Sequence, residues 1–139
     1  MISYTTEGTK MPDIKRRSIT AWIKEIAKAH GKVVGDIAYI FCNDDKILEI
    51  NREYLEHDYY TDIITFDYTE ENIIGGDIFI SLDTVRSNSE LLGLPYEQEL
   101  HRVIIHGVLH LCGIDDKAEG ARAVMEAEEN KALAKYPTL

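Results

Sequence analysis

The sequence lacks several features that would mark particular classes of protein. It has only two cysteines, Cys42 and Cys112, which are too few for the disulfide framework of a small secreted protein. No stretch approaches the roughly 18 consecutive apolar residues that a membrane-spanning helix needs. The first ten residues contain no apolar run of the kind that indicates a signal peptide. We therefore expect reduced thiols, a cytoplasmic location and no membrane partner.

Basic residues are also scarce. Lysine and arginine total 15 against 25 aspartates and glutamates, which gives a formal net charge of −10. This charge argues against a general nucleic-acid binder, whose surface would be basic over a wide area. It does not exclude a local basic patch, because several lysines and arginines fall within residues 10–28.

The length and the hydrophobic pattern predict one domain, residues 1–139, of the α+β class. Apolar residues recur at helical spacing over 14–30, and helices are also expected over 46–55, 82–92, 95–111 and 117–135. Short runs rich in β-branched and aromatic residues predict strands over 2–5, 36–42, 61–68 and 77–81. A small mixed sheet with helices is therefore the predicted fold.

The helix expected over 95–111 carries the most informative spacing in the chain. His106 and His110 are four residues apart, so both imidazoles lie on one face of a helix, one turn apart. Gly113 follows where the chain can turn back, and Asp116 comes soon after it. Two imidazoles and one carboxylate are good zinc ligands, and three protein ligands leave a position for water. We therefore predict one Zn²⁺ per chain, held by His106, His110 and Asp116.

Other interpretations of this spacing remain open. Zinc peptidases share it, but they carry a glutamate general base directly after the first histidine, where this chain has Gly107. Two histidines and one carboxylate also form the facial triad of some iron enzymes. Asp115 is the rival of Asp116 for the ligand role, and Asp116 could instead be a turn residue. The acidic run 126–129 is expected to be a solvated surface.

Four segments of the chain resemble the YbeY family of bacterial ribosomal-RNA maturation factors. Residues 106–116 read HGVLHLCGIDD, against H-G-x-L-H-L-x-G-x-D-H in the family. Residues 60–66 (YTDIITF) are similar to the family strand P-T-D-V-L-S-F, and residues 76–81 (GDIFIS) to G-D-I-x-I-S. Residues 51–54 (NREY) match the end of the family's L-N-x-x-Y helix. The motifs occur in the family's order.

The resemblance implies a zincin-like α+β fold and a zinc-dependent, single-strand-specific endoribonuclease of the cytoplasm. It implies a role in small-subunit ribosomal RNA processing and ribosome quality control, with ribosomal RNA or the small subunit as partner and no DNA. The alternatives are a non-catalytic ribosome-assembly factor with a structural metal and a zinc peptidase-like hydrolase. The metal ligands carried over by position are again His106, His110 and the residue at Asp116.

The chain departs from the family pattern at two positions. The third ligand is commonly histidine, whereas this chain has Asp116, and the arginine that follows the family's helix-end tyrosine is replaced by Leu55. In the family, that arginine would be expected to bind an RNA phosphate. The candidates that could replace it in space are three arginines at other positions: Arg52, Arg86 and Arg102. Three polar residues in the matched strands have either a structural role or one in supporting the metal ligands: Asp62, Asp77 and Ser81.

Overall fold

The computed structural model of the chain describes residues 1–55 and 61–136. Within these ranges the chain forms four strands and five helices. In chain order they are β1 (Ile2–Glu7), α1 (Arg16–Ala29), β2 (Val33–Cys42), α2 (Asp44–Tyr54), β3 (Ile63–Asp67), β4 (Ile73–Ser81), α3 (Leu82–Leu92), α4 (Tyr96–Leu111) and α5 (Ala121–Ala134). The prediction of an α+β fold is confirmed.

The strands of the described ranges form one mixed sheet in the order β1-β2-β4-β3. Both β1 and β4 run parallel to β2, whereas β3 is antiparallel to β4. β4 lies inside the sheet and is covered on both faces, so its sequence is almost continuously apolar or glycine. This arrangement places β3 at one edge of the sheet.

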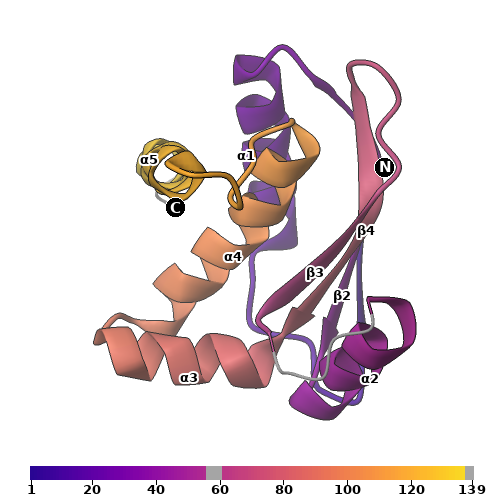
Figure 1. The fold of residues 1–139 in the computed structure, drawn as a ribbon, viewed down its shortest axis with the longest axis vertical. Coiled ribbons are helices and arrows are strands. Elements are labelled where there is room, and N and C mark those ends of the chain that lie inside the picture. Colours follow the sequence, from indigo (N-terminus) through magenta and orange to yellow (C-terminus); the bar gives the residue numbers. More distant parts are fainter. Residues whose placement is uncertain (56–60, 137–139) are drawn as a thin grey trace.

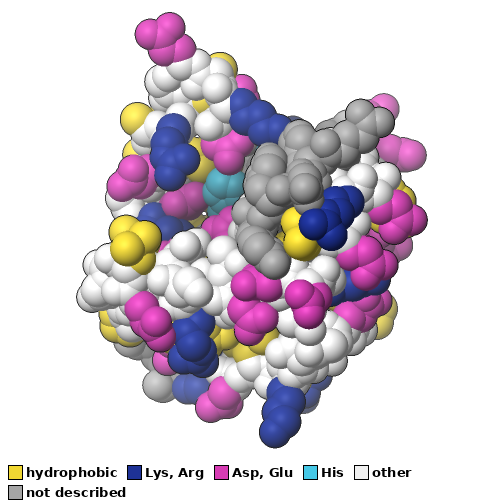
Figure 2. Space-filling model, turned by 60° about the horizontal axis from the view of Figure 1, so that its bottom comes forward, with side chains coloured by type: hydrophobic (Ala, Val, Ile, Leu, Met, Phe, Trp, Pro, Cys, Tyr) yellow, Lys and Arg dark blue, Asp and Glu magenta, His cyan; other side chains and the backbone are white. Residues whose placement is uncertain are grey.

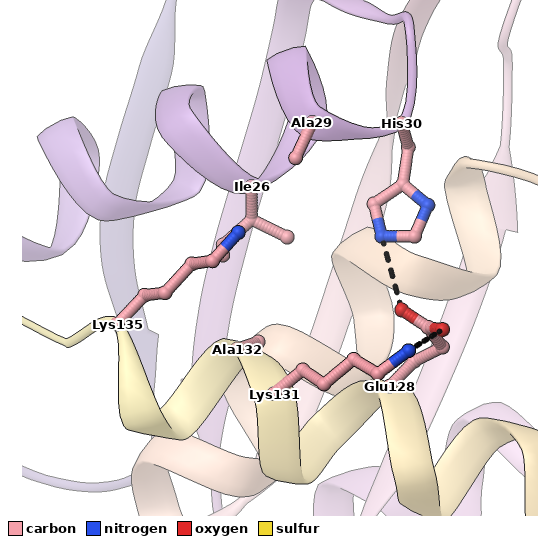
Figure 3. A pocket seen from close by; sticks show the side chains of 7 residues that line it. All are labelled: Ile26, Ala29, His30, Glu128, Lys131, Ala132 and Lys135. Carbon is pink, nitrogen blue, oxygen red and sulfur yellow. Dashed lines mark hydrogen bonds and ion pairs between the residues drawn. The ribbon is translucent and has the colours of Figure 1, made fainter.

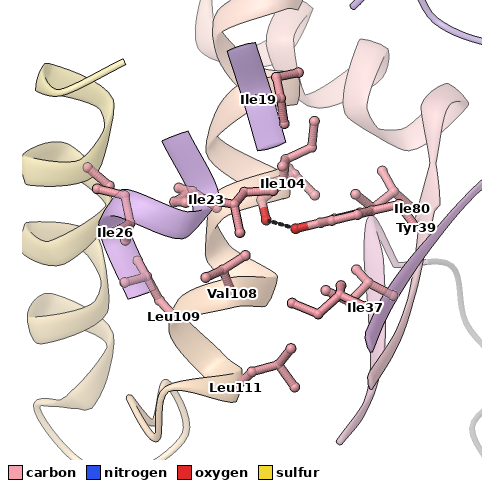
Figure 4. Close-up of a cluster of buried hydrophobic side chains, with 14 of the residues drawn as sticks. Ile19, Ile23, Ile26, Ile37, Tyr39, Ile80, Ile104, Val108, Leu109 and Leu111 are labelled. Carbon is pink, nitrogen blue, oxygen red and sulfur yellow. Dashed lines mark hydrogen bonds between the residues drawn. The ribbon is translucent and has the colours of Figure 1, made fainter. Parts of the chain in front are cut away.

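Helices cover the two faces of the sheet unequally. α1, α4 and α5 lie on one side and α2 on the other (Figure 1). The main core lies between the sheet and the α1–α4 layer, where Tyr39 of β2 donates its hydroxyl to the carbonyl of Ile104 at 2.9 Å (Figure 4). A smaller cluster on the other face joins Ile47 and Ile50 of α2 to Ile64 of β3. The layered core thus fixes α4 against β3 and β4.

α5 is held on the outside of this layer by polar and apolar contacts. Trp22 of α1 is fully buried and donates its indole N–H to the carbonyl of Ala132 at 2.8 Å. Met125 and Ala132 of α5 belong to the main core. α5 therefore has a fixed position beside α4, which matters for the site described below.

Most predicted elements are confirmed, with different ends. α3 has its predicted bounds and ends at Gly93, whose φ of 68° lies in the left-handed region that glycine favours. β2 and β4 begin earlier than predicted because Val33 pairs with Ile73 across the sheet, far from it in sequence. α5 begins at Ala121 rather than at 117, after Gly120. No helix of the described residues is long and apolar enough to cross a bilayer.

Candidate active site

The two motif histidines lie on α4, and the local sequence explains where this helix begins and ends. Pro95 precedes its first turn, in which Glu97 and Glu99 face the positive end of the helix dipole. After Leu111 the chain turns at Gly113, whose φ is 97°. The turn returns the chain along α4 toward the histidines, as the sequence predicts.

His106 is held between two carboxylates from different segments. Its Nε2 lies 3.3 Å from Oδ2 of Asp116, in the loop after α4. Its Nδ1 lies 2.7 Å from Oε2 of Glu129, on α5. Figure 2 shows histidine atoms recessed among acidic and basic side chains on one face of the molecule. The structure thus brings two of the three predicted ligands together.

Arg102 completes a network between α4 and α5. It lies one helical turn before His106 and donates to Oε1 of Glu129 at 2.9 Å. A second guanidinium nitrogen donates to Oδ1 of Asn130 at 2.8 Å. Glu129 therefore accepts from both residues with separate oxygens, and the three side chains tie the histidine face of α4 to α5.

These contacts shift the pKa values of the site in opposite directions. Burial alone would lower the pKa of His106, but its hydrogen bond to Glu129 and the charges of Glu129, Asp116 and Asp62 raise it above the ordinary value. For Glu129 the effects have the opposite sign. Burial alone would raise its pKa, but its bonds to His106 and Arg102 lower the pKa below the ordinary value. The contact between His106 and Glu129 therefore favours the ionised form of the Glu129 carboxylate.

The predicted metal site is only partly assembled. His110 follows His106 by one turn of α4 and is partly exposed, but among the described residues no group of three or more histidines, cysteines, aspartates and glutamates is placed to hold a metal ion. The donor set still fits zinc, because two donors on one tetrahedral zinc lie roughly 3.3–3.6 Å apart. The separation of His106 Nε2 and Asp116 Oδ2, 3.3 Å, falls within that span.

Gly107 lies on the sheet side of α4. A Cβ built there would lie 2.9 Å from Cδ1 of Ile78 and 3.2 Å from Cδ1 of Ile63. The glycine therefore allows α4 to approach β3 and β4 closely. The glutamate that a zinc peptidase carries after its first histidine would start against these two side chains at this position.

The rival ligand Asp115 has a different role. Its carboxylate accepts from the backbone N–H of Lys117 at 2.9 Å and of Ala118 at 3.3 Å. These bonds lower its pKa. Asp115 thus stabilises the turn that places Asp116 against His106, which is the arrangement typical of an Asx turn.

The strand residues that match the family motifs divide into two groups. Asp62 is partly buried, and its pKa is raised by burial, with His106 acting in the opposite sense, so its carboxyl belongs to the electrostatic environment of the site. Asp77 instead accepts from the hydroxyl of Tyr68 at 3.3 Å. Ser81 donates to Asp44 at 2.6 Å and caps α3. Asp77 and Ser81 therefore have structural contacts.

The candidate arginines also have different surroundings. Arg102 shares Glu129 with His106, as described above. The guanidinium of Arg86 on α3 lies 4.1 Å from the ring centroid of Tyr96, in a cation–π contact. Arg52 lies in the last turn of α2. Of the three, Arg102 is the one with a described contact to the histidine network.

The prediction that the whole acidic run 126–129 is solvated was wrong for Glu129. This residue is 8% exposed. It lies on the buried stripe of α5 with Met125 and Ala132, at helical spacing. A glutamate on the apolar stripe of the last helix was the available signal, since a buried carboxylate needs a partner.

Glu99 is a second buried carboxylate near this network, and it predicts a measurable pH effect. It is 5% exposed, and its Oε1 accepts no hydrogen bond from any residue that the structure describes. Burial and the charge of Asp62 raise its pKa. The folded state therefore holds this proton more tightly, and stability falls as the pH rises from the ordinary glutamate pKa through the raised one. We expect Glu99→Gln to increase the free energy of unfolding by about 1 kcal/mol at about pH 8.

Urea unfolding at about pH 8 and about pH 4.5 measures this effect, because the advantage of glutamine should shrink where glutamate is itself protonated. Glu97→Gln is the matched control, since Glu97 is exposed in the same helical turn and should gain nothing. A Glu99→Gln variant less stable than its parent at the higher pH would contradict the prediction.

Comparison with known proteins identifies the family. The family model described as Endoribonuclease YbeY matches residues 3–137. This chain belongs to the YbeY family. Endoribonuclease YbeY of Phocaeicola vulgatus is 72% identical over 134 residues, covering 96% of this chain and 97% of that protein. The corresponding protein of Bacteroides fragilis is 67% identical over 133 residues, covering 96% of each.

A solved structure has the same fold. The solution structure of TM1509 from Thermotoga maritima aligns with a TM-score of 0.68 at 28% identity, covering 96% of this chain and 87% of that one. Within the YbeY pattern, the structure places Asp116 beside His106, at the position of the third histidine of the common motif. Leu55, which replaces the motif arginine, is 40% exposed at the end of α2.

Proposed function

We propose that this chain is a zinc-dependent, single-strand-specific endoribonuclease that acts in the cytoplasm. Its substrate is small-subunit ribosomal RNA, and its role is in rRNA processing and ribosome quality control. Membership of a family whose members are named endoribonucleases supports the reaction class. The observation that carries the proposal is the placement of His106 against Asp116, one turn before His110 on the same helix.

His106, His110 and Asp116 would hold the zinc ion. When bound, Zn²⁺ would act as a Lewis acid toward a phosphoryl oxygen and lower the pKa of its water toward about 7. Glu129 lies 2.7 Å from Nδ1 of His106, on the side of the ring away from Asp116. Arg102 balances the charge of Glu129. Because the chain has a net charge of −10, RNA binding must depend on local contacts rather than on overall attraction.

Metal analysis followed by two cleavage assays tests the proposal. The purified protein should contain about one equivalent of zinc and should cleave a single-stranded ribosomal RNA precursor but not casein. Cleavage of casein would instead indicate a peptidase-like hydrolase. Bound metal with neither activity would indicate an assembly factor in which the metal ties α4 to the loop that follows it.

The two neighbouring aspartates should respond differently to substitution. Asp116→Ala should release zinc, because it removes the carboxylate that lies 3.3 Å from His106 Nε2. Asp115→Ala should keep zinc and lose about 1 kcal/mol of stability, because it removes two side-chain bonds to backbone N–H groups. Zinc titration with a competing chelator and urea unfolding give the two quantities.

Asp116→His serves as the conservative control. It restores the common family residue and should hold zinc at least as tightly as the parent. The carboxylate of the parent is a harder donor than imidazole, so the parent should also accept Mn²⁺ more readily than this variant. Unchanged zinc affinity in Asp116→Ala would show that Asp116 does not close the site.

A further inference from the structure

The two ring nitrogens of His106 face different parts of the protein. Nδ1 lies 2.7 Å from Glu129 on α5, and Nε2 lies 3.3 Å from Asp116 in the loop after α4. An ionised carboxylate can only accept a hydrogen bond. The shorter contact therefore places a proton on Nδ1, and in the neutral ring this leaves the lone pair on Nε2, the nitrogen that faces Asp116.

Glu129 is held in this position from its other side. Arg102 donates to Oε1 at 2.9 Å, so that Oε2 remains for His106. Arg102 is anchored in turn by Asn130, the residue after Glu129. Arg102 and His106 are one turn apart on α4, and Glu129 and Asn130 are adjacent on α5, so the carboxylate cannot rotate without breaking one of these bonds.

The burial of Glu129 also needs an explanation. The residue is 8% exposed and lies on the stripe of α5 that otherwise carries Met125 and Ala132. An apolar residue would pack there without the cost of removing a carboxylate from water, which its two partners must offset. Packing of α5 alone therefore gives no reason for a glutamate, whereas orientation of His106 does.

We propose that Glu129, supported by Arg102, is a positioning residue that fixes the Nδ1–H tautomer of His106 and presents Nε2 as the ligand atom. The assignment of Nε2 as a zinc ligand rests on the proposed function. The assignment of the tautomer does not rest on the proposed function, because it follows from contacts within the protein. Carboxylates that orient a metal-binding histidine in this way typically change metal affinity by about 10–100-fold when removed.

The first measurement uses metal-free protein. Nitrogen-15 NMR of the histidine rings, recorded above the pKa of His106, reports which nitrogen carries the proton. The parent should show the proton on Nδ1, and Glu129→Ala should show a mixture of the two tautomers. Glu129→Gln should largely retain the Nδ1 proton, because its amide oxygen can still accept.

The second measurement is zinc affinity by chelator competition. We expect a loss of about 10–100-fold in Glu129→Ala and a smaller loss in Glu129→Gln. Glu128→Ala is the matched control on the same helix. Glu128 turns toward His30 in a pocket between α1 and α5 (Figure 3). Its Oε2 lies 3.5 Å from Nε2 of His30, and its Oε1 lies 3.3 Å from Nζ of Lys131. This variant should change neither the tautomer nor the zinc affinity.

The outcomes separate the two proposals. A parent with its proton on Nε2, or a Glu129→Ala variant with an unchanged tautomer and affinity, would overturn the role of Glu129. A parent that binds no zinc would refute the proposed function, while the tautomer data would still decide whether Glu129 orients His106. If Glu129→Ala does not fold, the tautomer of the parent decides, together with the zinc affinity of Glu129→Gln, which should fall below that of both the parent and Glu128→Ala.

Discussion

Replacing His110 by alanine should reduce bound zinc well below one equivalent and reduce RNA cleavage by more than about 100-fold. Loss of a residue that only orients a ligand costs about 10–100-fold, and loss of a ligand should cost more. His106→Ala should have the same effect on zinc and cleavage. Elemental analysis and a cleavage assay on single-stranded ribosomal RNA measure both variants.

The two histidine variants should differ in stability. His110 is partly exposed in the last turn of α4, so its removal should cost little. His106→Ala leaves the buried Glu129 with Arg102 but without its bond to the imidazole, which should cost about 1–3 kcal/mol. His30→Ala is a matched control, because His30 pairs with Glu128 and not with Glu129. This variant should keep full zinc and activity. Full zinc in both His106→Ala and His110→Ala would refute the site assignment.

Gly107→Glu should lose at least about 4 kcal/mol of stability or fail to fold, rather than become a peptidase. The new side chain would begin against Ile78 and Ile63 and would place a charge between α4 and the sheet. Gly107→Ala should lose about 1 kcal/mol, because overpacking of about 1–3 kcal/mol outweighs a gain in helix propensity of about 1 kcal/mol. Urea unfolding and circular dichroism measure both effects.

A double-mutant cycle tests whether the contact with Ile78 causes the loss of stability in Gly107→Ala. Ile78→Val removes Cδ1, the atom that a Cβ at position 107 would approach to 2.9 Å. The pair Gly107→Ala and Ile78→Val should therefore lose less stability than the sum of the single variants. Strict additivity would show that the close approach of α4 to β4 is not what excludes a side chain. Casein cleavage by a folded Gly107→Glu variant would show that the position can serve a peptidase.

Local signals in the sequence determined the parts of the fold that depend on neighbouring residues. The bounds of α3 and its glycine stop, the capping of α2 by Asn43, and the turn at Gly113 all follow from residues close in the chain. The starts of β2 and β4 could not be predicted in this way. They depend on the pairing of Val33 with Ile73, two exposed residues whose strand character comes from their partners.

For the site, the sequence by itself determined that His106 and His110 share a helix face and that Gly113 returns the chain toward them. These follow from the 3.6-residue period and from the conformational freedom of glycine. Only the tertiary structure decided that Asp116 reaches His106 while Asp115 caps the turn. It also decided that Glu129 binds His106 from α5, because a carboxylate in an acidic run is solvated or buried according to what packs against its helix. That partner lies 23 residues away in the sequence.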